Sequence, residues 1–115
     1  MSRLLLIGDI EQIPKAEARN VRVDGLEVAV YRTRSDEVFA TQAHCPHAGG
    51  PLADGLLGEG KVICPLHERA FDLRTGRNLT DDCGNLRVYP VKLAADGKIT
   101  IELSGEGVTG TVSPL

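Results

Sequence analysis

Two short runs of the sequence combine cysteine and histidine at spacings suited to binding a metal. The first run is His44-Cys45-Pro46-His47, and the second is Cys64-Pro65-Leu66-His67. Five of the six cysteines and histidines of the chain fall inside the 24 positions from 44 to 67. In each run a soft thiolate and an imidazole lie close together, so one tight loop can direct both donors at a single point. The runs predict a metal centre on Cys45, His47, Cys64 and His67.

Two other chemistries fit these four residues less well. Tetrahedral Zn²⁺ accepts two thiolates and two imidazoles, but zinc modules more often pair two cysteines in one knuckle and two histidines in the other. Each run here mixes the two residue types. A catalytic Cys–His pair would leave the second cysteine and histidine, at matching spacing, unexplained. A structural zinc site is therefore kept as the alternative.

The spacing of the four residues resembles a known signature. Cys-x-His, sixteen intervening residues and Cys-x-x-His is similar to Rieske proteins, in which two cysteines hold one iron of a [2Fe–2S] cluster and two histidines hold the other. The likeness extends through Leu52–Gly55, Phe71–Gly76 and Leu86–Val91, and covers roughly residues 4–103. It implies one cluster per chain on Cys45, His47, Cys64 and His67. It also implies an all-β fold, an antiparallel sandwich or barrel with a small cluster-binding subdomain at about 43–76.

One histidine and one cysteine lie outside this pattern. His44 is expected to face solvent or to form local hydrogen bonds rather than to bind metal. Cys83 lies in the loop Thr80–Gly84 and has no cysteine left over for a disulfide, so a free thiol is expected there.

Four positions near the ligands bear on the reduction potential. Rieske proteins of the respiratory and photosynthetic cytochrome complexes carry two further cysteines that bridge the cluster loops, where this sequence has Gly50 and Leu66. They also place a serine and a tyrosine hydroxyl beside the cluster, where this sequence has Arg69 and Phe71. Hydroxyl donors stabilise the added charge of the reduced cluster. Their absence predicts a potential near the low end of the Rieske range, roughly −150 mV.

Short strands separated by turn residues must position the two loops. Asp24-Gly25 between two β-branched runs predicts a hairpin over residues 21–31, and a second hairpin is expected over 89–103 with its turn at Ala94–Gly97. Further strands are expected at 4–7, 37–41 and 61–63, a turn at Gly55–Gly60, and at most one helical turn within 11–19. The pattern indicates one all-β domain over residues 1–115, with a loosely held tail at about 104–115.

Composition excludes several classes of partner. The chain has 42% apolar and 25% charged residues, which is ordinary for a globular domain. A net charge of −3 without a run of lysine or arginine argues against nucleic-acid binding. No stretch reaches the roughly 18–20 apolar residues that span a bilayer, and Leu4–Ile7 is too short for a secretory signal. Three cysteines without an even pattern favour a reducing cytoplasm.

The combined features predict a one-electron carrier that is not catalytic alone. All three histidines lie between positions 44 and 67, so no facial triad for a mononuclear iron can be built. No G-x-G-x-x-G fingerprint for a dinucleotide is present. Hydride chemistry must therefore come from another polypeptide.

The resemblance also suggests partners. It implies an NAD(P)H-dependent flavin reductase as electron donor and a terminal ring-hydroxylating oxygenase as acceptor. The alternative acceptor is the large subunit of an assimilatory NAD(P)H nitrite reductase. The expected docking face surrounds His47 and His67, with a small apolar patch from Ala48, Gly49, Pro51 and Leu66. A structural or regulatory metal-binding subunit without a redox role is the alternative from a second class.

Overall fold

The structure, a computed structural model, describes residues 2–23, 25–44, 51–58, 60–64, 69–80 and 84–104. Within these ranges the chain forms antiparallel strands and two single turns of 3₁₀ helix, η1 and η2. The predicted all-β fold is confirmed. The elements are β1 (Ser2–Asp9), η1 (Ile10–Gln12), β2 (Glu17–Val23), β3 (Leu26–Arg32), β4 (Val38–Gln42), η2 (Leu52–Asp54), β5 (Leu56–Gly58), β6 (Lys61–Ile63), β7 (Ala70–Asp72), β8 (Val88–Tyr89), β9 (Val91–Leu93) and β10 (Lys98–Ser104).

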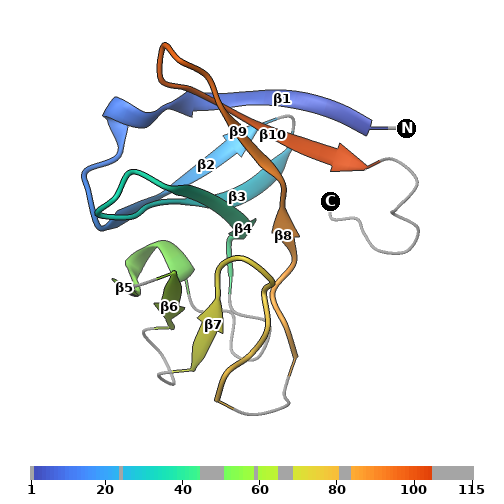
Figure 1. Ribbon diagram of the computed structural model, residues 1–115. Helices are drawn as coiled ribbons and strands as arrows, with labels where there is room; N and C mark the ends of the chain where they lie inside the picture. Colours follow the sequence, from blue (N-terminus) through green and yellow to red (C-terminus); the bar gives the residue numbers. More distant parts are fainter. Residues whose placement is uncertain are drawn as a thin grey trace.

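Two sheets pack together to form the base of the molecule. One has the strand order β1-β10-β9 and the other β2-β3-β4-β8, and Figure 1 shows β1 and β10 running across the β2–β3 hairpin. Alternate residues of β3 and β10 supply the core between them, because successive side chains of a strand point to opposite faces. The buried residues of this first core include Val28, Val30, Ile99 and Ile101.

Both predicted hairpins are present. β2 pairs with β3 from Glu17↔Arg32 to Val23↔Leu26, and Gly25 in the connection has φ +79°. Asp24 lies outside the described residues. In the second hairpin, β9 pairs with β10, and the Gly97 N–H donates to the Ala94 carbonyl at 2.9 Å.

A third sheet, β5-β6-β7, corrects one expectation. The segment Gly55–Gly60 was expected to be a turn, but Leu56–Gly58 forms a strand that pairs with β6. A row of apolar side chains across the sheet explains why this segment is a strand. Leu57 lies opposite Val62, and Val62 lies opposite Phe71. These side chains pack into a second core, which also holds Tyr31 from β3 and Leu86. Burial of this row therefore orders a strand too short to show a periodic pattern.

The segment between β1 and β2 contains one short helical turn. A single 3₁₀ turn is present at Ile10–Gln12, and β2 begins at Glu17. Asp9 caps the turn, since its carboxylate accepts from the Glu11 N–H at 3.0 Å. The expectation of at most one helical turn within 11–19 is met, but the turn begins one residue earlier.

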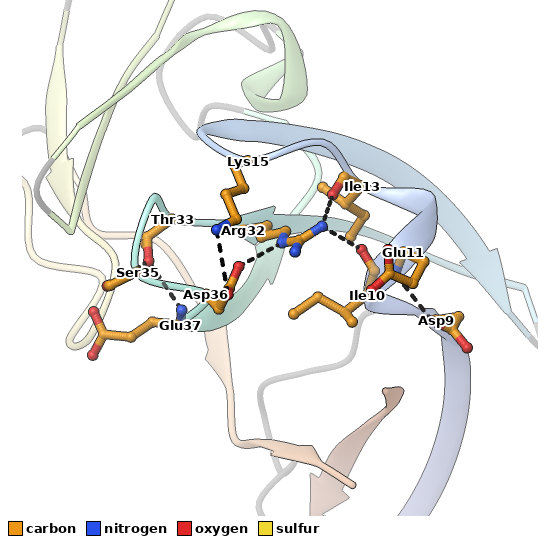
Figure 2. A network of polar contacts seen from close by, with 10 residues as sticks. All are labelled: Asp9, Ile10, Glu11, Ile13, Lys15, Arg32, Thr33, Ser35, Asp36 and Glu37. Atoms are coloured by element: carbon orange, nitrogen blue, oxygen red, sulfur yellow. Dashed lines mark hydrogen bonds and ion pairs between the residues drawn. The ribbon is translucent and has the colours of Figure 1, made fainter. Parts of the chain in front are cut away.

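Arg32 at the end of β3 holds this turn in place. Its guanidinium donates to the carbonyl oxygens of Ile10 and Ile13 at 3.1 and 2.8 Å, and to the Asp36 carboxylate at 2.9 Å (Figure 2). The Arg32 hydrogen bond holds the pKa of Asp36 below its ordinary value. The fork geometry of the guanidinium makes these contacts simultaneous.

No helix in the described part of the chain is long and apolar enough to cross a membrane. The tail predicted from about residue 104 falls almost wholly outside the described residues, since β10 ends at Ser104.

Candidate metal centre

The second cysteine–histidine run begins at a buried cysteine. Cys64 directly follows β6, is fully buried and is a free thiol. Its N–H donates to the Arg69 carbonyl at 2.8 Å, and the pairing of β6 with β7 continues from there. Cys64 and Arg69, the residues on either side of segment 65–68 that includes His67, are therefore hydrogen-bonded to each other.

The first run is closed at its base in a similar way. His44 and Pro51 form an isolated antiparallel bridge, and the Leu52 N–H donates to the Ala43 carbonyl at 3.0 Å. Leu52 is fully buried at the start of η2. The residues on either side of segment 45–50, which carries Cys45 and His47, are thus paired with each other.

The bases of the two runs are joined through a glycine. A Cβ placed on Gly55 would lie 2.2 Å from the carbonyl oxygen of Ile63, which directly precedes Cys64. Only glycine permits this approach of backbone to backbone. Leu52 and Cys64 also belong to the same buried core. The described residues that border the two runs are therefore neighbours in space, although 12 residues separate Pro51 from Cys64 in the sequence.

Of the four predicted ligands, the structure describes Cys64 alone; Cys45, His47 and His67 lie outside the described residues. Among the residues that are described, no three metal-binding side chains gather. The donor set nevertheless fits a [2Fe–2S] cluster, because it offers two thiolates and two imidazoles and its one described member, Cys64, is a buried free thiol. The His44 side chain is exposed, in agreement with its expected role, and Cys83 also lies outside the described residues.

Gln42 at the end of β4 braces the first loop, a role that the sequence did not reveal. Its side-chain amide donates to the His44 carbonyl at 2.8 Å, and its amide oxygen accepts from the Arg87 N–H at 2.7 Å. Its own N–H donates to the Arg87 carbonyl at 2.9 Å. One side chain thus ties the residue before Cys45 to the segment that leads into β8.

We expect Gln42→Met to remove both side-chain hydrogen bonds and to leave the Arg87 N–H without its acceptor. The loss should lower the free energy of unfolding by about 1–3 kcal/mol and speed the bleaching of the visible spectrum by a chelator. Thermal unfolding and absorbance decay measure the two effects. Gln12→Met, in the distant 3₁₀ turn, is the control: it removes the acceptor for the Asp9 N–H and should not change the bleaching rate. If the two variants bleached at the same rate, Gln42 would have no specific role in retaining the cluster.

A buried pair of hydroxyl groups involves Tyr31 of the second core. The Tyr31 hydroxyl and the Thr41 hydroxyl are 2.8 Å apart, and both residues are fully buried. Thr41 donates to the Gln42 carbonyl at 2.8 Å, so Tyr31 is the donor in the pair. Burial raises the pKa of Tyr31 well above its ordinary value, and the Thr41 hydrogen bond opposes this rise.

Tyr31→Phe should cost about 1 kcal/mol of stability at neutral pH, because it removes one buried hydrogen bond. The pH dependence has a definite sign. The pKa of Tyr31 is raised in the folded state above the unfolded value of 10.0, so its contribution is complete below that pH and is lost as pH rises further. The stability gap between parent and variant should therefore narrow from about pH 9 to about pH 11. Chemical denaturation across this range measures it, and a gap that widens would contradict the assignment.

The chain matches a known protein family over most of its length. The family described as the Rieske [2Fe-2S] domain matches residues 3–90. The ferredoxin component of the naphthalene 1,2-dioxygenase system of Pseudomonas aeruginosa is 36% identical over 94 residues, which are 81% of this chain and 88% of that protein. A nitrite reductase [NAD(P)H] of Emericella nidulans is 33% identical over 99 residues, which cover 78% of this chain and 9% of that protein.

A solved structure shares the fold. The protein assigned as the small subunit of an NADH-dependent nitrite reductase from Mycobacterium tuberculosis superimposes with a TM-score of 0.83 at 23% identity, and the match covers 90% of this chain and 97% of that one. The antiparallel β architecture described above is therefore shared along nearly the whole length of both chains.

Proposed function

The chain belongs to the Rieske [2Fe-2S] domain family, and we propose that its single cluster is held by Cys45, His47, Cys64 and His67. The chain is a one-electron carrier, as are the ferredoxin components to which it is similar. The observation that carries the ligand assignment is the place of Cys64. It is a buried free thiol at the base of a loop that contains a histidine, joined through Gly55 to the base of the other loop.

The described residues suit a carrier because backbone pairing joins the residues on either side of segment 45–50 and those on either side of segment 65–68. When bound, a [2Fe–2S] cluster supplies reversible transfer of one electron. The protein contributes a fixed frame: the Cys64 N–H bond to Arg69, the His44–Pro51 bridge and the Gln42 brace. A packed core of Leu52, Phe71 and Leu73 excludes water from one side of Cys64.

We place this carrier between an NAD(P)H-dependent flavin reductase and a terminal oxygenase in the cytoplasm. The support is the 36% identity to a dioxygenase ferredoxin over most of both chains. Nitrite assimilation is the second candidate, favoured by the nitrite reductase relative and by the run Cys-Pro-His-Ala-Gly-Gly-Pro-Leu. A metal-binding subunit without redox function is the third and differs from both in one respect: it would not exchange electrons.

Anaerobic stopped-flow mixing separates these candidates. The dithionite-reduced chain is mixed with the oxidised terminal dioxygenase of the naphthalene 1,2-dioxygenase system and, in parallel, with an assimilatory NAD(P)H nitrite reductase large subunit. Our proposal predicts rapid reoxidation of the chain by the dioxygenase. Reoxidation by the nitrite reductase alone would favour the second candidate, and a chain that dithionite does not reduce would support the third.

The reduction potential gives a separate prediction. Phe71 is fully buried in the same core as Cys64 and offers no hydroxyl to that core. The Tyr31 hydroxyl, also in this core, is already donated to Thr41. Neither of these two described aromatic residues thus offers a free hydroxyl to stabilise the reduced state, so redox titration should give a midpoint of roughly −150 mV, and a value well above 0 mV would contradict this reasoning.

A further inference from the structure

An apolar row crosses one end of the sheet β5-β6-β7, next to the loop 65–68. Leu56 lies opposite Ile63, and Ile63 lies opposite Ala70. The Phe71–Asn78 bridge continues this register, so Leu79, whose N–H donates to the Ala70 carbonyl at 2.7 Å, lies opposite Ala70. Residues directly opposite on antiparallel strands share one face of a sheet. We call Leu56, Ile63, Ala70 and Leu79 the flank row.

The flank row faces away from the protein. The neighbouring row of the same sheet, which includes Val62, Phe71 and Asn78, is buried, so the alternate positions point outward. Leu56 is 72% exposed and Leu79 is 47% exposed, while Ile63 and Ala70 between them are partly exposed. Three strand spacings separate the two leucines, which is about 14 Å. Two largely exposed leucines at the ends of one row form a continuous apolar strip of the kind that marks an interaction site.

The flank row lies next to Cys64, one of the predicted cluster ligands. Ile63 directly precedes Cys64, and Ala70 directly follows Arg69, whose carbonyl accepts the Cys64 N–H. In Figure 1 the sheet β5-β6-β7 forms the end of the molecule opposite to β1 and β10. A protein bound on the flank row would therefore be next to Cys64 and remote from the first core.

Positive charge borders the row on the side away from the loops. The next outward positions are Gly58, Lys61, Asp72 and Arg77, since Gly58 lies opposite Lys61 and Lys61 opposite Asp72. The Asp72 carboxylate accepts the backbone N–H groups of Arg74 and Thr75 at 2.8 and 3.4 Å. Among the described residues, no carboxylate lies within ion-pair distance of Lys61 or Arg77. Lys61 and Arg77 lie on either side of Asp72, so this border carries two positive charges and one negative charge in a chain of net charge −3.

We propose that the flank row is a docking surface for the electron acceptor, a terminal oxygenase whose contact face is apolar in the middle and acidic toward Lys61 and Arg77. This inference rests on the proposed function. Transient redox complexes use small interfaces, and complementary charge at the rim steers their encounter. The flank row supplies the apolar centre, Lys61 and Arg77 supply positive charge at one rim, and Cys64 directly follows Ile63 of the row at the other.

Paired leucine variants test the proposal. Leu56→Ser with Leu79→Ser removes both ends of the flank row, and Leu4→Ser with Leu6→Ser removes leucines of similar exposure, 57% and 59%, from β1. Each double variant is reduced with dithionite and mixed with the dioxygenase used above. The flank variant should need about tenfold more oxygenase for half-maximal transfer, with an unchanged spectrum and midpoint potential. The β1 variant should behave as the parent.

A charge variant provides a second, independent readout. Lys61→Glu with Arg77→Glu should slow transfer at low salt, and the difference from the parent should shrink as salt is added. If the flank variant transfers as the parent does, or if both leucine variants are weakened equally, the docking surface is wrong and the electron-carrier function stands. If the parent itself fails to reduce the oxygenase, the proposed acceptor is wrong, and this inference is wrong as well.

Discussion

Replacing Cys64 with serine should yield a protein that is nearly colourless after anaerobic purification. Loss of even an outer partner of a metal ligand costs about 10–100-fold in metal affinity, so loss of a ligand should reduce bound iron at least tenfold. The serine hydroxyl at this fully buried position would also replace an apolar thiol in the second core. Since metal binding contributes folding energy, the thermal unfolding temperature should fall as well. Iron content and visible absorbance measure the first effect, and circular dichroism measures the second.

Two variants act as controls for this result. His44→Ala changes an exposed side chain next to Cys45, and Cys83→Ser removes the cysteine outside the signature. Both should keep the visible spectrum of the parent. Cys45→Ser and His67→Ala should behave as Cys64→Ser does. If His44→Ala lost the cluster while Cys64→Ser retained it, the assignment of the four ligands would be wrong.

Gly76→Ala should cause the second large loss, because this glycine is a contact point between two segments. Its φ is +80°, and an added Cβ would lie 2.1 Å from the Leu86 carbonyl oxygen. The Leu86 N–H donates to the Gly76 carbonyl at 2.7 Å, so the two backbones cannot separate without breaking that bond. Left-handed strain and overpacking together should cost about 2–5 kcal/mol. The unfolding temperature should fall by roughly 10–20 °C.

Gly60→Ala is the matched control for the backbone conformation alone. Gly60, between β5 and β6, has φ +76°, but nothing lies within 4 Å of an added Cβ. Its loss should be only about 1–2 kcal/mol, which is the strain of the left-handed region. Similar unfolding temperatures for the two variants would show that the contact with Leu86 carries little of the stability.

The sequence was sufficient for features that depend on local pattern. Alternation placed Ile99 and Ile101 on one face, and both are buried. The strand expected at Lys61–Ile63 has those bounds. The Asp-Gly and Gly97 turns marked both hairpins because few residues adopt positive φ at low cost. The spacing of cysteine and histidine predicts a ligand set of which the structure describes Cys64 alone, so the full set stays a prediction.

Features that depend on distant partners were not visible in the sequence. β5 has three residues and an exposed leucine at its start, and pairing with β6 defines it rather than its own composition. Gln42 contacts Arg87 across 45 positions of sequence, which no local pattern encodes. Gly55 and Gly76 stand at the ends of segments that resemble the Rieske family, but only the close approach of Ile63 and Leu86 explains why glycine is needed there.

Chemical analysis of the purified protein tests the central claim most directly. Iron, acid-labile sulfide and zinc are measured per chain in material prepared without oxygen, together with the visible spectrum before and after dithionite. Two irons and two sulfides, with a red-brown colour that bleaches in part on reduction, are the expected result for one [2Fe–2S] cluster. A colourless protein that contains zinc and neither iron nor sulfide would contradict the electron-carrier account.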